Sequence, residues 1–209
     1  MTSPRRFGPE NSATRSRLLD TTERLMLEEG YAAVSTRRVA KEVGLTPALV
    51  HYYFKTTDDL LVALYRRSTE RNLEQLDAAL NSERPLQALW DLSSDAVRTG
   101  LTMEFRALAN HRKVIGVEIA RYAEQARGLQ AAAISRVLER APIDQKLFTP
   151  AGVTVLIAGL ARAMVMEEGV GITAGHEDAR AIVEWLLGRL EPQGSPPNRA
   201  TERPASPPS

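Results

Sequence analysis

The residues best suited to contact a charged partner lie in the stretch STRRVAKEVGLTPALVHYYFK, residues 35–55. This stretch sets His51, Tyr52 and Tyr53 side by side, close to several arginines and lysines. Successive positions of a helix point about 100° apart, so three consecutive rings cannot all enter one core. We therefore expect outward-facing rings here, and rings flanked by cations suit contacts with nucleic-acid bases and phosphates.

Two short helices joined by a tight turn are predicted to position these rings. Ser35 can cap the first helix, and Thr46 can cap the second, with Pro47 at a first position where the missing N–H does no harm. Gly44 lies where the chain must leave the first helix with a positive φ, which glycine adopts most easily. These signals agree with one another and predict a helix-turn-helix.

The second of these helices has an inner and an outer side. Val50 and Phe54 are spaced i and i+4 and should bury it, which turns the remaining positions outwards. Such a helix fits the major groove of DNA, where His51 and Tyr52 can reach base edges, whereas residues such as Lys55 hold phosphates. Tyr53 fits a packed position equally well, and Arg37 could be only a solvated charge. The predicted DNA-binding residues are Thr36, Arg37, Thr46, Pro47, Ala48, His51, Tyr52, Tyr53 and Lys55.

The distribution of charge agrees with a polyanionic partner. The chain has 209 residues and a formal net charge of +1, which by itself indicates no partner. Residues 1–55, however, hold nine Lys and Arg against six Asp and Glu. A basic end on a near-neutral protein is typical of a module that binds nucleic acid.

Other features of composition limit the compartment and the chemistry. The absence of cysteine excludes disulfides and thiolate metal sites. Residues 1–12 lack the apolar core of a secretory signal. The most apolar run, residues 153–165, is interrupted by Arg162 and is too short to cross a bilayer of about 30 Å. We expect a soluble, cytoplasmic protein with no membrane partner.

The pattern along the chain predicts an all-α protein. Nearly everything between residues 13 and 190 has helical periodicity, and the strict alternation of strands is missing. One helix is expected from Pro85 to about Thr99, with a break at Gly100, and a long helix from Thr57 should join two blocks without a flexible linker. The predicted divisions are a flexible basic N-terminal arm at 1–12, a three-helix helix-turn-helix DNA-binding domain at 13–56, a ligand-binding and dimerisation helical domain at 57–190, and a disordered Pro/Ser-rich tail at 191–209.

The segment from about Arg15 to Tyr65 resembles the DNA-binding domain of the TetR/AcrR family of bacterial transcriptional regulators. The features that carry this resemblance are the Gly30-Tyr31 break, the run Gly44-Leu45-Thr46 and the end Tyr52-Tyr53-Phe54-Lys55. The resemblance implies a homodimer on a pseudo-palindromic double-stranded DNA operator. It also implies a C-terminal helical domain that binds a small molecule and releases DNA, usually giving repression.

Three positions depart from the pattern of that family. The family often has Tyr at the position of His51, which suggests a different base preference here. It often has a phosphate-contacting Lys at the position of Thr57, and Lys55 and Arg38 are expected to offset this loss. Arg38 itself stands where an acidic residue commonly completes a capping box.

The larger block contains candidates for an effector pocket. Aromatic residues and methionines with few charges suggest a largely apolar ligand of unknown identity, and Arg106 or Arg121 could orient an acidic headgroup. For any single candidate, an ordinary core position is the favoured alternative. The candidates are Trp90, Met103, Phe105, Leu108, His111, Tyr122 and Met164.

The last two helices are expected to form a dimer interface. Small residues let helices approach closely, and a broad apolar face follows on the final helix, although an intramolecular core is the competing explanation. The candidate interface residues are Gly152, Leu156, Gly159, Ala163, Ile182, Trp185 and Leu186.

The sequence contains no convincing motif for an enzyme active site or a metal site. The glycine-rich GVGITAG, residues 169–175, resembles a dinucleotide fingerprint but follows a helix instead of a strand. His111 and His176 lack the spaced partners of a metal site. We therefore expect a ligand-responsive, DNA-binding repressor with no cofactor and no metal. The alternatives are a DNA-binding regulator without a small-molecule ligand, and an all-α enzyme.

Overall fold

The computed structural model of this chain describes residues 12–191, and the expected N-terminal arm and C-terminal tail lie almost wholly outside that range. The all-α class is confirmed, since residues 12–191 form helices and no strand. A single 3₁₀ turn, Tyr31–Ala33, lies between the first two helices. The helices are α1 (Ala13–Glu29), α2 (Thr36–Glu42), α3 (Pro47–Tyr53), α4 (Thr57–Leu80), α5 (Pro85–Ser93), α6 (Ala96–Ala109), α7 (Lys113–Leu138), α8 (Pro150–Glu168) and α9 (His176–Leu190).

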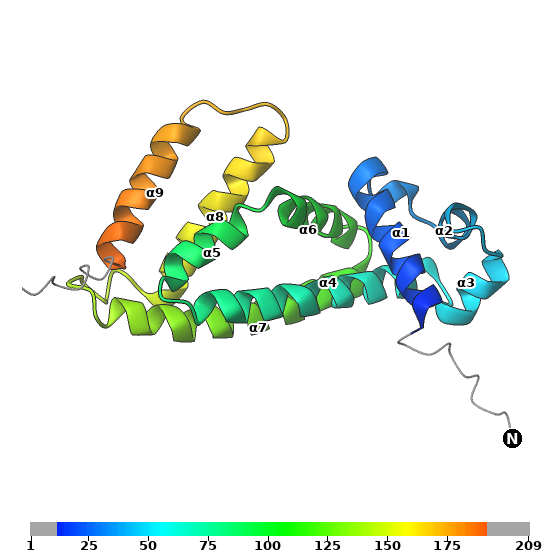
Figure 1. Cartoon of the computed structure of the whole chain (residues 1–209), viewed down its shortest axis with the longest axis horizontal. Helices are drawn as coiled ribbons and strands as arrows, with labels where there is room; N and C mark the ends of the chain where they lie inside the picture. Colours follow the sequence, from blue (N-terminus) through cyan, green and yellow to red (C-terminus); the bar gives the residue numbers. More distant parts are fainter. Residues whose placement is uncertain (1–11, 192–209) are drawn as a thin grey trace, which may run out of the picture.

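The long helices α4 and α7 form the base of the molecule. They pack against each other along much of their length, and α1–α3 lie at one end of α4 (Figure 1). Helices α5, α6 and α8 lie across the base, and α9 follows α8 at the opposite end from the helix-turn-helix (Figure 1). Helix α4, which begins at Thr57, therefore connects the helix-turn-helix to the larger helical block, as expected from the sequence.

One expected helix break was misplaced. Gly100 lies inside α6, and the chain breaks instead at Ser94–Asp95. Asp95 is the N-cap of α6, where its Oδ1 accepts a hydrogen bond of 2.7 Å from the backbone N–H of Arg98. A capped end satisfies an N–H group that would otherwise lack a partner, whereas a glycine inside a helix costs only about 1 kcal/mol.

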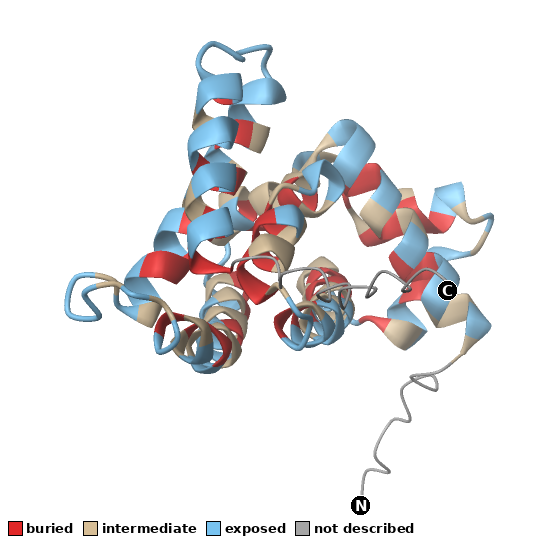
Figure 2. Cartoon of the chain, turned by 60° about the vertical axis from the view of Figure 1, so that its left-hand side comes forward, coloured by how far each residue is buried: buried red, intermediate tan, exposed pale blue. Residues whose placement is uncertain are grey.

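Two apolar cores hold the described chain together, with their buried residues between the helices (Figure 2). The first core joins α1–α3 and the start of α4 to Leu101, Phe105 and Leu108 of α6 and Ile115 of α7. The second joins the far half of α4 to α5, α7, α8 and α9. The first core therefore continues across the expected domain boundary at residue 56, so α1 and α6 are packed partners.

Helix α8 is longer than the apolar run expected from the sequence. By length and composition alone α8 could cross a membrane. The core helix of a globular protein can have the same length and composition, so this is weak evidence for a membrane span. In this structure α8 packs against α5, α6 and α7. Packing in the bundle accounts for the buried residues of α8, but Val155, Leu156 and Leu160 remain exposed.

Candidate DNA-binding surface and effector cavity

The turn between α2 and α3 has the geometry that the sequence predicts. Gly44 has φ of +68°, in the left-handed region. The backbone N–H of Leu45 donates to the carbonyl of Ala40 at 2.9 Å, and that of Gly44 donates to the carbonyl of Lys41 at 3.2 Å. This pair of bonds is a Schellman motif, which ends α2 sharply. Thr46 then caps α3, so the direction of α3 is set by local chemistry.

The outer side of α3 is open to solvent. Val50 is 0% exposed and Phe54 3%, whereas Tyr52 is 46% exposed. Tyr53 is half-buried and meets Tyr52 edge-on, with ring centroids 5.2 Å apart. Thr36 departs from the prediction, because its side chain is buried and offers little surface to a phosphate. The candidate residues that are exposed are Arg37, Thr46, Pro47, Ala48, His51, Tyr52 and Lys55.

His51 has a defined proton arrangement. Its Nδ1 lies 3.0 Å from the carbonyl oxygen of Lys55. A carbonyl can only accept, so Nδ1 carries the hydrogen of this bond. In the neutral ring Nε2 is then an acceptor, suited to an amino group of adenine or cytosine at the edge of the major groove.

The structure shows the surroundings of Arg38 and Thr57, two residues that depart from the pattern of the TetR/AcrR family. Arg38 forms ion pairs with Glu29 at 2.9 Å and Glu42 at 3.1 Å, so it connects α1 to α2 instead of offering a free charge to a phosphate. Thr57 is the first residue of α4 and lies next to a capping box formed by Thr56 and Asp59, which was not predicted from the sequence. The signal was the spacing of Thr56 and Asp59, which satisfy each other's backbone N–H groups.

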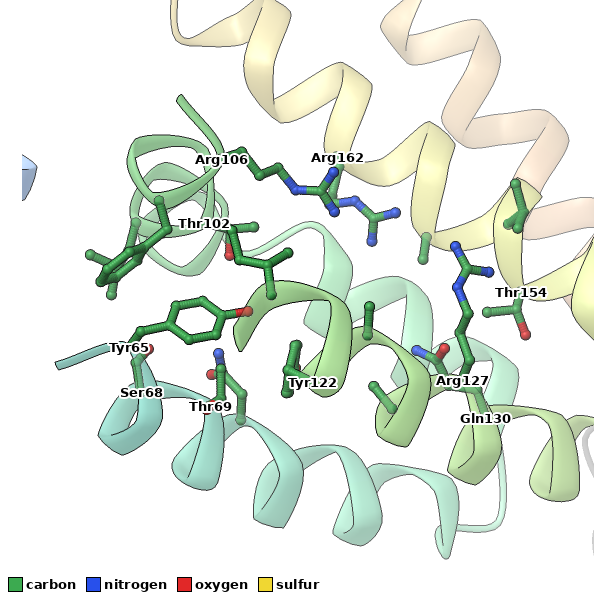
Figure 3. Close-up of a pocket in the computed structure, with 18 residues that line it drawn as sticks. Tyr65, Ser68, Thr69, Thr102, Arg106, Tyr122, Arg127, Gln130, Thr154 and Arg162 are labelled. Atoms are coloured by element: carbon green, nitrogen blue, oxygen red, sulfur yellow. The ribbon is translucent and has the colours of Figure 1, made fainter. Parts of the chain in front are cut away.

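A cavity of about 140 Å³ lies between α4, α6, α7 and α8 (Figure 3). Two of the seven predicted ligand residues, Phe105 and Tyr122, line it. The other five do not. Trp90, Leu108 and Met164 are buried in the two cores. Met103 is half-buried on α6 outside the lining, and His111 stacks on Tyr31 with ring centroids 6.5 Å apart.

The cavity lining is more polar and more basic than the sequence suggested. Arg106 lines it as one of the two suggested arginines, whereas Arg121 lies outside the lining and pairs with Glu118 at 2.7 Å. Arg127 and Arg162 were missed, although Arg162 inside the apolar run 153–165 was a signal. Hydroxyl and amide groups complete the polar lining: Tyr65, Ser68, Thr69, Asn72, Thr102, Gln130 and Thr154.

Arg162 is half-buried in the cavity lining, whereas Arg106 and Arg127 are exposed to solvent. Burial lowers the pKa of Arg162, and the nearby charges of Arg106 and Arg127 lower that pKa further. Burial also raises the pKa of the Tyr65 and Tyr122 hydroxyls, so both are neutral at physiological pH. No aspartate or glutamate is among the residues that line the cavity.

The candidate dimer residues form an exposed apolar surface on α8 and α9. Leu156 is 68% exposed, Ile182 66% and Trp185 60%. Gly152 and Ala163 are also exposed, and Gly159 and Leu186 are half-buried. Large apolar side chains that are this exposed are typical of a surface that another protein covers.

Sequence comparison gives matches centred on the N-terminal helices. Residues 18–64 match the family model described as bacterial regulatory proteins, tetR family. The chain is 31% identical over 113 residues to the transcriptional regulator PksA of Bacillus subtilis, covering 50% of this chain and 55% of that protein. It is 27% identical over 107 residues to AcrR of Shigella flexneri, covering 50% of this chain and 49% of that protein. The match thus spans about half the length of these curated relatives.

Solved structures extend the likeness to most of the fold. A structure from Rhodococcus sp., named as a TetR-family transcriptional regulator, has a TM-score of 0.69 at 19% identity and covers 86% of this chain and 100% of that chain. A transcriptional regulator from Saccharomonospora viridis, solved in complex with choline, has a TM-score of 0.71 at 17% identity and covers 83% and 95% of the two chains. Residues 18–64 thus match the helix-turn-helix of the tetR family of bacterial regulatory proteins, and the described chain shares the fold of solved TetR-family regulators.

Proposed function

We propose that this protein is a cytoplasmic DNA-binding transcriptional repressor. The observation that carries the proposal is the solvent-exposed outer side of α3, which presents Ala48, His51 and Tyr52 on a capped helix within a TetR-family helix-turn-helix. A helix that reads bases needs small residues for close approach and polar or ring-bearing side chains at base edges. Its neighbours Arg37 and Lys55 supply the positive charge that phosphates require.

The repressor acts as a homodimer on a pseudo-palindromic operator. The apolar surface of α8 and α9 supports this, because two copies can bury it in a four-helix contact. A two-fold dimer presents two copies of α3, which must lie roughly 34–36 Å apart to enter successive major grooves of B-DNA.

Effector binding in the cavity is proposed to control the position of the DNA-binding helices. Helix α6 lines the cavity and also carries Glu104, whose Oε2 accepts a hydrogen bond of 2.6 Å from the backbone N–H of Tyr31. A second contact, between Arg112 and Asp58, joins the start of α4 to the turn before α7. A ligand that prefers one arrangement of α6 therefore shifts the separation of the two α3 helices by its differential affinity.

Two alternative functions have less support. A regulator without a small-molecule ligand would not need the polar, charged cavity between four helices. An all-α enzyme is disfavoured by the family match and by relatives that are transcriptional regulators. Within residues 12–191, no group of three His, Asp or Glu side chains could hold a catalytic metal.

Selection of binding sites from random duplexes tests this function. We expect the full chain to enrich one pseudo-palindrome. His51→Ala and Tyr52→Ala should each reduce the discrimination against a mismatched base by about 1–3 kcal/mol, because they contact base edges. Lys55→Ala should instead weaken specific and random DNA alike and flatten the dependence on salt.

Lys146→Ala is the matched control for Lys55→Ala, since Lys146 is an exposed lysine in the loop between α7 and α8. It should leave the affinity for operator DNA unchanged. Failure to bind any duplex at low salt would contradict the function. Equal effects of the His51, Tyr52 and Lys55 variants on specific and random DNA would contradict the assignment of base and phosphate contacts.

A further inference from the structure

Three arginines from three different helices line one cavity without any lining carboxylate, and from this we propose that the effector is a small organic dianion. Arg106 comes from α6, Arg127 from α7 and Arg162 from α8. This inference rests on the proposed function, because it names the chemical class that the effector cavity takes. It replaces the largely apolar ligand expected from the sequence.

The arrangement of the three guanidinium groups points to a shared partner. Figure 3 shows Arg106 and Arg162 next to each other above the cavity and Arg127 on its other side. A second pocket of about 120 Å³ adjoins the first, shares Arg106 and Arg162 with it, and adds Arg98. A ligand in this region would therefore meet cationic groups on several sides.

The charges of these arginines are not balanced within the described chain. Among residues 12–191, Arg106, Arg127 and Arg162 form no ion pair with a carboxylate. Several other exposed arginines, by contrast, do have a carboxylate partner. Arg66, for example, pairs with Glu118 at 2.6 Å. Arg106 and Arg127 act as like charges on the half-buried Arg162, and a bound anion reduces this repulsion.

The chemistry of the lining defines the ligand more closely. Guanidinium groups bind phosphate and carboxylate oxygens through paired N–H donors. Two or more negative charges match three arginines better than a single charge does. The lining also includes Leu101, Phe105, Ile119 and Ala158, which offer apolar surface to a short hydrocarbon body. Phosphate monoesters and dicarboxylates share this chemistry.

A cation does not fit this site. The structure from Saccharomonospora viridis holds choline, but at 17% identity it shares only the fold with this chain. Choline is a quaternary ammonium ion, a class that proteins recognise with aromatic cages. Three unpaired guanidinium groups would repel it, so choline is a useful negative probe here.

Titration calorimetry on the full chain tests the proposal with four probes: hexyl phosphate, adipate, hexanoate and choline. We expect one or both dianions to bind at least about tenfold more tightly than the monoanion hexanoate, since each added charge-assisted contact contributes about tenfold. Choline should not bind. A preference for hexyl phosphate over adipate would identify the phosphate ester as the form recognised. Dianions that bind no more tightly than hexanoate would overturn the proposal.

Substitutions separate a built site from general attraction to a basic protein. Arg127→Gln and Arg162→Gln should each weaken dianion binding by about tenfold or more. Arg136→Gln is the matched control, because Arg136 is an exposed arginine on the same helix as Arg127 but does not line the cavity. Equal losses in Arg127→Gln and Arg136→Gln would overturn the proposal.

Thermal unfolding without ligand shows whether these variants fold. Arg162→Gln removes a dehydrated, repelled charge, so its Tm should equal or exceed that of the wild type. Addition of the dianion should raise the Tm of the wild type and of Arg136→Gln, but not that of Arg162→Gln. A similar rise in all three proteins would contradict the site.

Operator binding distinguishes this inference from the proposed function. If the dianion binds through the arginines and lowers operator affinity, both are supported. If it binds in this way but leaves operator affinity unchanged, the anion site stands and ligand control fails. If the chain binds its operator but no dianion, the DNA-binding function stands and the anion site is overturned.

Discussion

At the scale of single residues, Gly44 has a strict backbone requirement in the turn between α2 and α3. Its φ of +68° allows the two Schellman hydrogen bonds that end α2. A Cβ added to Gly44 would meet no atom within 4 Å, so space is not what restricts this position. The restriction is the left-handed backbone itself, which side-chain-bearing residues disfavour.

We expect Gly44→Ala to lower the free energy of unfolding by about 1–2 kcal/mol, because alanine in the left-handed region is strained. Gly128→Ala is the matched control. Gly128 lies within α7, and its added Cβ also meets nothing within 4 Å. That variant should instead stabilise the protein by about 0.5–1 kcal/mol. Urea denaturation followed by circular dichroism measures both, and equal changes of the same sign would refute the explanation.

At the scale of elements, Glu118 fastens α4 to α7. Its carboxylate accepts hydrogen bonds from Arg66 at 2.6 and 3.1 Å and from Arg121 at 2.7 Å. The hydrogen bonds from Arg66 lower the pKa of Glu118 to about 2, with Arg121 as a smaller cause and burial acting in the opposite direction. The packing of α4 on α7 thus includes a charged contact as well as two apolar cores.

This lowered pKa predicts how stability depends on pH. The ionised carboxylate is favoured in the folded chain, so its contribution is fully present above the ordinary pKa of about 4.5 and is lost as pH falls towards 2. Glu118→Gln should therefore be less stable than the wild type at pH 7, by on the order of 1 kcal/mol because Arg66 and Arg121 are largely exposed.

Thermal unfolding between pH 3 and 7 measures this difference, which should stay constant from pH 7 to about 5 and decrease only at lower pH. Glu124→Gln serves as the control, since Glu124 is an exposed residue of the same helix. A difference between wild type and Glu118→Gln that does not change with pH would rule out the ionised carboxylate as its source.

At the scale of the whole molecule, the exposed face of α8 and α9 is the surface through which we propose that two copies assemble. This face lies at the far end of the molecule from α3 (Figure 1). A two-fold axis through it would set the distance between the two α3 helices. In the proposed dimer, the position of this contact would therefore also set the spacing of half-sites in the operator.

Ile182→Glu places a charge in the centre of this face and should convert the dimer to a monomer, because a buried unpaired carboxylate is costly. Sedimentation velocity measures the mass directly, and operator affinity should fall with it. Val97→Glu is the matched control, because Val97 is 67% exposed and lies on α6, away from the face. A dimer that survives Ile182→Glu would place the contact elsewhere.

Local features were accessible from the sequence because each depends on residues only a few positions apart. The caps at Ser35 and Thr46, the turn at Gly44 and the inward spacing of Val50 and Phe54 all act within one or two helical turns. The all-α class and the outer side of α3 follow from such signals. The break predicted at Gly100 was wrong and shows the limit of such local signals. The helix begins at the Asp95 cap and continues through the glycine.

The cavity was decided by tertiary structure. Arg106, Arg127 and Arg162 are separated by 21 and 35 residues along the chain, and no periodic pattern connects them. Only the packing of α6, α7 and α8 brings them to one site, while the same packing removes Trp90 and Met164 into a core. Sequence by itself thus determined which helices form and how α3 is presented. The fold determined which charges face one another, because contacts between distant helices depend on how the helices pack and not on spacing along one of them.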